Sequence, residues 1–457
     1  MALHDLSSGP VRGHLLRMSA FMLVTMVVQT VYGLIDLFWV GRLGRDAVAA
    51  VSLGSNLMMA TMAVSQVLAV GATALVSQAM GRKDMPAVAQ LFNQALLIAA
   101  IAGLGIGGLF FGLRHGYASA LSRDPATIAL TAKFLAWFAP AMALQIPVMV
   151  LTSALRGVGN MRIATFTILS STVPSCVNVA MRMLIFGWGT GRPLGVGGAA
   201  LATLLAMLIG SGTMLWHVVR SPVYLARGVG AWKPQPSLWR RMAGIGLPSG
   251  LEMALMTAYM AAVMGLLQRF GSAGQAGFGI GMRVLQAGMM PSMALCFAAG
   301  AIVGQNLGAQ RPDRVRETFW LCLRYAITTA AVFVVLFHIA PHWLIEPFSA
   351  DPAVIVAGSD FLRLISWNLI GSAVVFACFG MFSGLGDTRP SLISSAVRIG
   401  LILLPATWLA QRDGFAPLWI WYLSVAATAV QAALNLWFLR GRLRHLRSDS
   451  GPAVAVA

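Results

Sequence analysis

One carboxylate interrupts an apolar stretch near the start of the chain. The segment YGLIDLFWVG contains Asp36, and the nearest charged residue before it is Arg17. Gln29, Tyr32 and Asp36 are spaced i, i+3 and i+7, which places them on one face of a helix. A carboxylate inside a membrane is costly and usually belongs to an ion pathway, and loss of water favours its protonated form. The spacing predicts an ion-coupling group. The alternative is an acid near the outer end of its span that reaches the interface.

A second polar pair occurs further along, in SCVNVAMRMLIFG. Asn178 and Arg182 are four residues apart, so they share a face of one helix. An ion pair between Arg182 and Asp36 would favour the ionised acid and compete with a cationic substrate. It would also make a sodium site improbable, because a fixed cation would replace an oxygen ligand. The alternative is that Arg182 snorkels to the outer interface without a partner.

A second acid, Glu252, lies about nine residues into a later apolar run, in LPSGLEMALM. With a rise of ~1.5 Å per residue, it is expected roughly 16 Å nearer the cytoplasm than Asp36. The two acids are therefore predicted to belong to separate sites. Glu252 could accept a proton or attract a cation from the inner mouth. It could instead be a buried acid satisfied by neighbouring hydroxyls and amides.

Apolar runs long enough to cross a bilayer recur along all 457 residues and must position these side chains. The composition is 58% hydrophobic and 10% charged, with a mean hydropathy of +0.78. Because helices satisfy their own backbone in lipid, we predict an all-α membrane protein with twelve transmembrane helices. The predicted spans lie near residues 15–40, 48–80, 88–113, 128–152, 163–187, 195–219, 243–268, 275–305, 318–345, 354–382, 392–411 and 416–440.

The net charge of +18 is explained by topology rather than by a nucleic-acid partner. With both termini in the cytoplasm, most Lys and Arg fall in the inner segments, as the positive-inside rule requires. None of the four cysteines lies in a C-x-x-C pair, and no histidine has a metal-like spacing to an acid, so neither disulfide nor metal is indicated. The inner group includes Arg12, Arg82, Lys83, Arg156, Arg311, Arg389, Arg398 and Arg440.

The chain repeats itself at a constant offset of 227 residues. ALVSQAMG at 74–81 returns as AIVGQNLG at 301–308, and RGVGNMR at 156–162 returns as SGLGDTR at 383–389. An even number of spans in each half makes the repeats parallel, as in one common transporter plan. We predict two pseudo-symmetric six-helix lobes, 1–220 and 243–457, joined by a cytoplasmic linker at 221–242. Such bundles indicate alternating access.

These motifs resemble the multidrug and toxic compound extrusion (MATE) family. The resemblance is carried by IDLFWVGRLG, by VSQAMG with VGQNLG, and by RGVGN with SGLGD. It implies two lobes that open in a V, and export of organic, often cationic compounds against inward flow of protons or sodium. Gln29 and Tyr32 match the DinF-like branch, in which Asn178 would join the polar cluster around Asp36.

Several positions bear on the branch. The NorM-like branch of the family carries carboxylates in its seventh and tenth helices. Here the only acid in the predicted tenth span is Asp360, and Glu252 lies about one turn before the NorM-type glutamate of the seventh. Both features favour the DinF-like branch. In contrast, Phe21 stands where the family usually has a proline, whereas its repeat partner Pro248 is present. A kink in the first helix would therefore need another cause.

The sequence thus predicts a secondary antiporter for multidrug efflux, driven by protons, with sodium as the alternative ion and no cofactor. Its expected partners are small organic substrates and the lipid bilayer, without nucleic acid, and it is expected to act as a monomer in the inner (plasma) membrane. One alternative is a flippase for lipid-linked precursors, which the small number of intramembrane basic residues, chiefly Arg182 and Arg283, disfavours. A membrane-embedded transferase is disfavoured because no D-D-x-x-D motif occurs.

Overall fold

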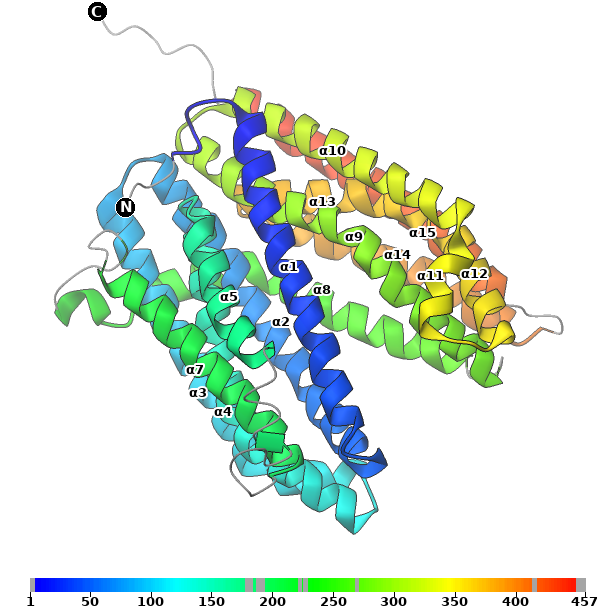
Figure 1. Ribbon diagram of the computed structural model, residues 1–457. Helices are drawn as coiled ribbons and strands as arrows, with labels where there is room; N and C mark the ends of the chain where they lie inside the picture. Colours follow the sequence, from blue (N-terminus) through cyan, green and yellow to red (C-terminus); the bar gives the residue numbers. More distant parts are fainter. Residues whose placement is uncertain are drawn as a thin grey trace, which may run out of the picture. The chain divides into compact units, whose positions relative to one another are not determined.

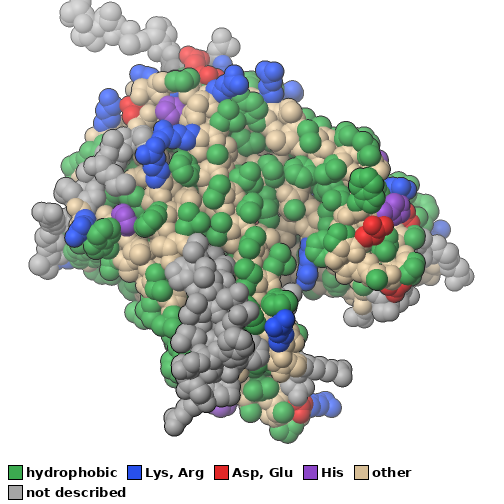
Figure 2. All heavy atoms as spheres, in the orientation of Figure 1, with side chains coloured by type: hydrophobic (Ala, Val, Ile, Leu, Met, Phe, Trp, Pro, Cys, Tyr) green, Lys and Arg blue, Asp and Glu red, His purple; other side chains and the backbone are tan. Residues whose placement is uncertain are grey.

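The computed structural model describes residues 5–176, 184–185, 194–220, 224, 229–267, 271–412 and 417–448. Every secondary-structure element in that part is a helix, which confirms the all-α prediction (Figure 1). Eleven of the described helices are long and apolar enough to cross a membrane. On the face drawn in Figure 2, apolar side chains cover much of the surface. This is the surface expected of a chain surrounded by lipid.

The helices divide into two units by their contacts. One unit contains Phe21–Gly250, and the other combines Leu6–Ala20 with the chain from Leu251 onward. In the first unit, α4 packs against α2, α3 and α7, and α5 packs against α7 (Figure 1). The helices up to the one that crosses into the second unit are α1 (Val11–Gly41), α2 (Arg45–Gly81), α3 (Met85–Leu121), α4 (Pro125–Gly157), α5 (Met161–Cys176), α7 (Val196–Arg220), η1 (Val229–Trp232) and α8 (Pro236–Leu267).

The second unit is built around α9, which packs against α10, α12 and α13. Helix α15 packs against both α13 and α14. The helices of this half are α9 (Gly271–Gly308), α10 (Pro312–Ile339), α11 (Pro341–Ile345), η3 (Glu346–Phe348), α12 (Pro352–Ile365), α13 (Asn368–Leu385), α14 (Arg389–Leu409) and α15 (Pro417–Ser448).

The predicted tenth span, 354–382, is not one continuous helix. The structure divides it into α12 and α13, with a turn at Ser366 and Trp367. The Leu369 N–H donates to the Ser366 carbonyl at 2.8 Å, so the chain tightens locally to an i+3 pattern. Under the repeat offset, Trp367 corresponds to Pro140, which lies inside α4. The first repeat thus keeps one continuous helix with a proline at the equivalent position, whereas the second repeat divides into two helices there.

The sequence repeat is also present in the backbone. Gly159 and Gly386, which are 227 residues apart, both have left-handed conformations, with φ of 79° and 80°. Lys83 and Gln310 form a second equivalent pair, with φ of 60° and 56°. The two G-x-G segments are therefore helix-ending turns that need a glycine, as in other left-handed helix caps.

The first helix of each repeat passes from one unit to the other. Helix α1 belongs to the second unit up to Ala20, and α8 belongs to the first unit up to Gly250. Phe21 and Pro248 are equivalent in the repeat, so both helices change unit at nearly the same place. The predicted lobes, 1–220 and 243–457, follow the repeat instead of these contacts and stay a prediction.

The segments that precede α1 and α8 are both anchored by side-chain amides. The Leu6 N–H donates to Gln305 Oε1 at 2.9 Å, and Leu6 is buried. In the first unit, Gln94 Nε2 donates to the Lys233 carbonyl at 2.8 Å, and Gln94 Oε1 accepts from the Gln235 N–H at 3.0 Å. These amides satisfy backbone groups that the helices cannot satisfy themselves. Each crossing helix is therefore fixed at its start.

Two glycines let the start of α8 lie directly against α2. A Cβ atom placed at Gly246 would overlap the Val67 carbonyl oxygen and would lie 2.6 Å from the carbonyl carbon. A Cβ atom at Gly71 would overlap the Met242 carbonyl oxygen. Small residues at such crossings let membrane helices approach closely, where packing replaces the hydrophobic effect as the source of stability.

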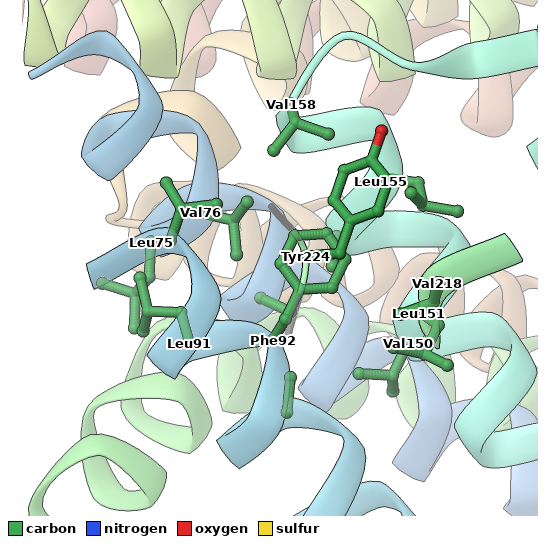
Figure 3. Close-up of a cluster of buried hydrophobic side chains, with 14 of the residues drawn as sticks. Leu75, Val76, Leu91, Phe92, Val150, Leu151, Leu155, Val158, Val218 and Tyr224 are labelled. Carbon is green, nitrogen blue, oxygen red and sulfur yellow. The ribbon is translucent and has the colours of Figure 1, made fainter. Parts of the chain in front are cut away.

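Tyr224 anchors the connection between the repeats in the core of the first unit (Figure 3). Its ring is 2% exposed and lies 5.4 Å from the Phe92 ring, centroid to centroid. Asn160 Nδ2 donates to the Tyr224 hydroxyl at 2.8 Å. Burial raises the pKa of Tyr224 above its usual value near 10, and the hydrogen bond from Asn160 partly opposes this. Because the pKa of Tyr224 is higher in the folded state, its neutral hydroxyl contributes fully to the free energy of unfolding below about pH 10. That contribution is lost as the pH rises further.

Replacing Tyr224 with alanine is expected to destabilise the protein by about 3–5 kcal/mol through the cavity alone. The Asn160 amide would also lose its acceptor, so the loss should lie at the upper end of that range. Tyr224→Phe should cost much less, because the ring stays. Tyr422→Ala is the matched control, since Tyr422 is 57% exposed. Thermal unfolding in detergent measures the difference, and equal effects of Tyr224→Ala and Tyr422→Ala would contradict the anchor.

Candidate transport site

The polar face of α1 is described in part. Gln29 is exposed, and Tyr32 is half-buried. The Tyr32 hydroxyl lies 3.4 Å from Thr203 Oγ1 of α7, which in turn donates to the Ala199 carbonyl. Tyr32 therefore points toward α7, within the first unit. The sequence did not single out Thr203, although a hydroxyl inside an apolar span was a signal for it.

Further hydroxyl pairs lie along α1, α5 and α7. Thr25 Oγ1 is 3.3 Å from Thr165 Oγ1, and Ser170 Oγ is 3.1 Å from Thr213 Oγ1. Thr25, Ser170 and Thr213 also donate to a backbone carbonyl of their own helix, as serine and threonine do in membrane helices. Thr165 donates instead to the Phe21 carbonyl of α1. The first unit thus contains a series of neutral polar contacts between the helices that surround the α1 polar face.

Three of the predicted site residues cannot be placed by their side chains. Asp36 lies in α1, but its side chain is outside the described part of the structure. Asn178 and Arg182 lie outside the described residues altogether. The ion pair between Arg182 and Asp36 therefore stays a prediction, as do the roles of these three residues.

Glu252 lies in the middle of α8 and is held by two serines of α14. Ser391 Oγ donates to Glu252 Oε2 at 2.9 Å, and Ser395 Oγ donates to Oε1 at 2.5 Å. Gln431 of α15 donates to Ser395 Oγ at 2.9 Å and extends the network. Both carboxylate oxygens thus have a hydroxyl donor, which matches the expectation that hydroxyls and amides would satisfy a buried acid. Whether Glu252 also carries an ion stays a prediction.

Arg398 is a cation close enough to interact with this acid. It is the tenth residue of α14, a helix of 21 residues that can span the membrane. Its guanidinium carbon lies 5.6 Å from the centre of the Tyr259 ring, and it attracts Glu252 electrostatically. Its place in the sequence predicted a topology charge in an inner segment, but Arg398 lies well inside the helix. Its spacing of i+7 from Ser391 and i+3 from Ser395 was the signal that could have placed it on the same face.

Most other described acids have structural roles or lie on the surface. Asp124 and Asp351 cap the starts of α4 and α12 by accepting backbone N–H groups. Asp387 forms an ion pair with Arg442, and Asp360 is exposed on α12. Among the residues that the structure describes, no group of three His, Cys, Asp or Glu side chains is placed to hold a metal ion.

Comparison with known proteins finds exporters along nearly the whole chain. It is 24% identical over 448 residues to a protein of Shewanella oneidensis named FAD transporter, with 96% of each chain covered. It is 24% identical over 426 residues to the multidrug export protein MepA of Staphylococcus haemolyticus, with 92% of each covered. A solved structure described as an outward-facing multidrug resistance MATE family transporter has a TM-score of 0.88 and 22% identity, over 97% of this chain and 98% of that one.

The family assignment rests on both repeats. The MatE family model matches residues 22–181 and residues 248–409, so each match begins close to the point at which α1 or α8 changes unit. Together these segments cover well over half of the chain. The solved structures support the same helical fold. The chain therefore belongs to the MatE family and is a multi-pass membrane transporter for small molecules, not an enzyme.

Proposed function

We propose that this transporter is a secondary antiporter that exports organic cationic or amphipathic compounds in exchange for protons, by alternating access. The names of its relatives, a multidrug export protein and an FAD transporter, support export of organic molecules. The two names do not agree on a single substrate, which is consistent with a broad substrate range. We further propose that it acts as a monomer in the inner membrane, with both termini in the cytoplasm.

The observation that carries this proposal is the contact between Tyr32 and Thr203. It turns one face of α1 toward α7, and position 36 follows one turn later on that same face. Intramembrane acids on a protein-facing side of a helix usually serve ion pathways. We assign proton coupling to Asp36 on this basis.

Glu252 is the weaker candidate for the coupling group. The positive charge of Arg398 nearby already balances its negative charge in the second unit. A carboxylate balanced in this way attracts a substrate cation less than an isolated one does. We therefore propose that Glu252 offsets the charge of Arg398 and that Asp36 exchanges the proton.

The test is transport by the purified full-length protein in liposomes. We would impose a proton gradient and, separately, a sodium gradient, and follow a fluorescent rhodamine methyl ester, which is an organic cation. The proposal expects dye movement against its own gradient under the proton gradient alone. Movement under the sodium gradient alone would replace the proton by sodium. No movement under either gradient would contradict the antiporter.

The position of Arg398 keeps a second function open, which is translocation of lipid-linked precursors. A basic side chain inside a span could hold a phosphate group. A flippase would move a fluorescent polyprenyl phosphate across the bilayer and leave the rhodamine ester in place. The same liposomes therefore separate the two functions.

A further inference from the structure

We propose that a cluster in the second unit, formed by Glu252, Tyr259, Arg398 and Asn435, binds the carboxylate or phosphate group of an amphipathic substrate. The inference rests on the proposed export of organic compounds and concerns the amphipathic ones among them that carry an acidic group. All four residues belong to the unit that continues from Leu251.

The cluster contains hydrogen-bond donors with no acceptor. Arg398 Nε and Asn435 Nδ2 are buried and have no hydrogen-bond acceptor among the described residues. Asn435 is fully buried, and its Oδ1 already accepts from Ser394 at 2.8 Å, so its orientation is fixed. A guanidinium has five N–H donors and cannot accept, and a buried donor without an acceptor is costly. The cluster therefore favours a ligand that supplies acceptor oxygens.

The charge of Arg398 is offset by an acid that does not occupy its N–H groups. Both oxygens of Glu252 accept from Ser391 and Ser395, and Glu252 does not form a direct ion pair with Arg398. The acid offsets the charge of Arg398 from a distance while leaving the guanidinium N–H groups free of it. Arginine in this condition is suited to oxyanions, because its planar fork matches carboxylate and phosphate geometry.

An aromatic side chain lies beside this cation. Tyr259 is 6% exposed, and its ring faces the guanidinium of Arg398. An aromatic ring against a guanidinium holds the guanidinium plane in place and offers apolar contact beside it. The cluster thus combines a fixed cation with an aromatic surface, which fits an amphipathic compound rather than an inorganic anion.

The test uses two fluorescent rhodamines that differ only in one group, the free carboxylate and its methyl ester. Their dissociation constants would be measured by fluorescence anisotropy with the purified full-length protein in lipid nanodiscs. Arg398→Gln is expected to weaken binding of the carboxylate dye by about tenfold or more, and to change binding of the ester by less than about twofold. Arg398→Lys, which keeps the charge without the planar fork, should lie between wild type and Arg398→Gln for the carboxylate dye.

Glu252→Gln is expected to act in the opposite direction. Removing the negative charge leaves Arg398 unbalanced, so the carboxylate dye should bind about threefold more tightly or better. A merely structural role for Arg398 and Glu252 would weaken both dyes in every variant. Arg412→Gln is the control, because Arg412 follows α14 and stacks on Trp408 at 4.0 Å, outside the cluster. Thermal unfolding of each variant confirms that it folds.

The outcomes are separable from those of the proposed function. Equal effects of Arg398→Gln on the two dyes, or no binding of the carboxylate dye to the wild type, would overturn the cluster as an oxyanion site. Tight binding of the carboxylate dye without movement under any gradient would keep the site and remove the antiporter. Proton-driven movement of the ester with no role for Arg398 would do the reverse.

Discussion

Replacing Asp36 with asparagine should reduce proton-driven movement of the rhodamine ester to the rate of protein-free liposomes. Asparagine has nearly the same size as aspartate, so the packing of α1 should be retained. It cannot bind and release a proton, however, and it carries no charge to exchange for a cation. Because the two ligands of an antiporter compete for one group, removal of that group stops both halves of the cycle.

Two variants make this result specific. Asp360→Asn removes an exposed acid of α12 and should leave dye movement within about twofold of wild type. Asp36→Glu keeps a titratable group and should retain part of the activity. If Asp36→Asn moved the dye at the wild-type rate, the coupling group would have to be sought elsewhere, and Glu252 would be the first candidate.

The largest effect on folding is expected for Gly246→Val. The added side chain would meet the backbone of Val67, and a backbone carbonyl cannot rotate away as a side chain can. Inserting extra carbon atoms into a packed interior usually costs about 1–3 kcal/mol, and a clash with backbone should exceed that range. Helix α8 would have to leave α2, and with it the anchor at Gln94.

Gly244→Val provides the matched control on the same helix. A Cβ atom at Gly244 meets no atom within 4 Å, although the residue lies only two positions away. The melting temperature and the monodisperse fraction in size-exclusion chromatography should therefore fall sharply for Gly246→Val and stay near wild type for Gly244→Val. Similar losses for both would show that glycine is needed for the helix itself and not for the crossing.

The sequence predicted the framework well because membrane helices and internal repeats leave local signals. Apolar length located nearly every span, and the 227-residue offset correctly paired turns such as those at Gly159 and Gly386. The serine partners of Glu252, and the glutamine that donates to one of them, were expected only as types of residue, hydroxyls and amides. Spacing within one helix does not reveal which face of α14 meets α8, so Ser391 and Ser395 could not be named.

Features that depend on tertiary contacts were missed. Arg398 looked like an inner topology signal, since hydropathy gives its depth only within several residues. The break at Ser366 was missed because that segment has no proline or glycine at the turn, unlike its counterpart at Pro140. The exchange of α1 and α8 between units has no local signal at all, because both helices read as ordinary spans.

That exchange sets an order for synthesis. The face of α2 around Val67 and Gly71 is completed by the start of α8, which leaves the ribosome about 9–35 s later at ~5–20 residues per second. The hydrogen bond from Leu6 to Gln305 of α9 can form only later still, because Gln305 is synthesised after α8. Neither unit can therefore finish folding on its own half of the nascent chain. The two repeats therefore complete their folding together, late in translation.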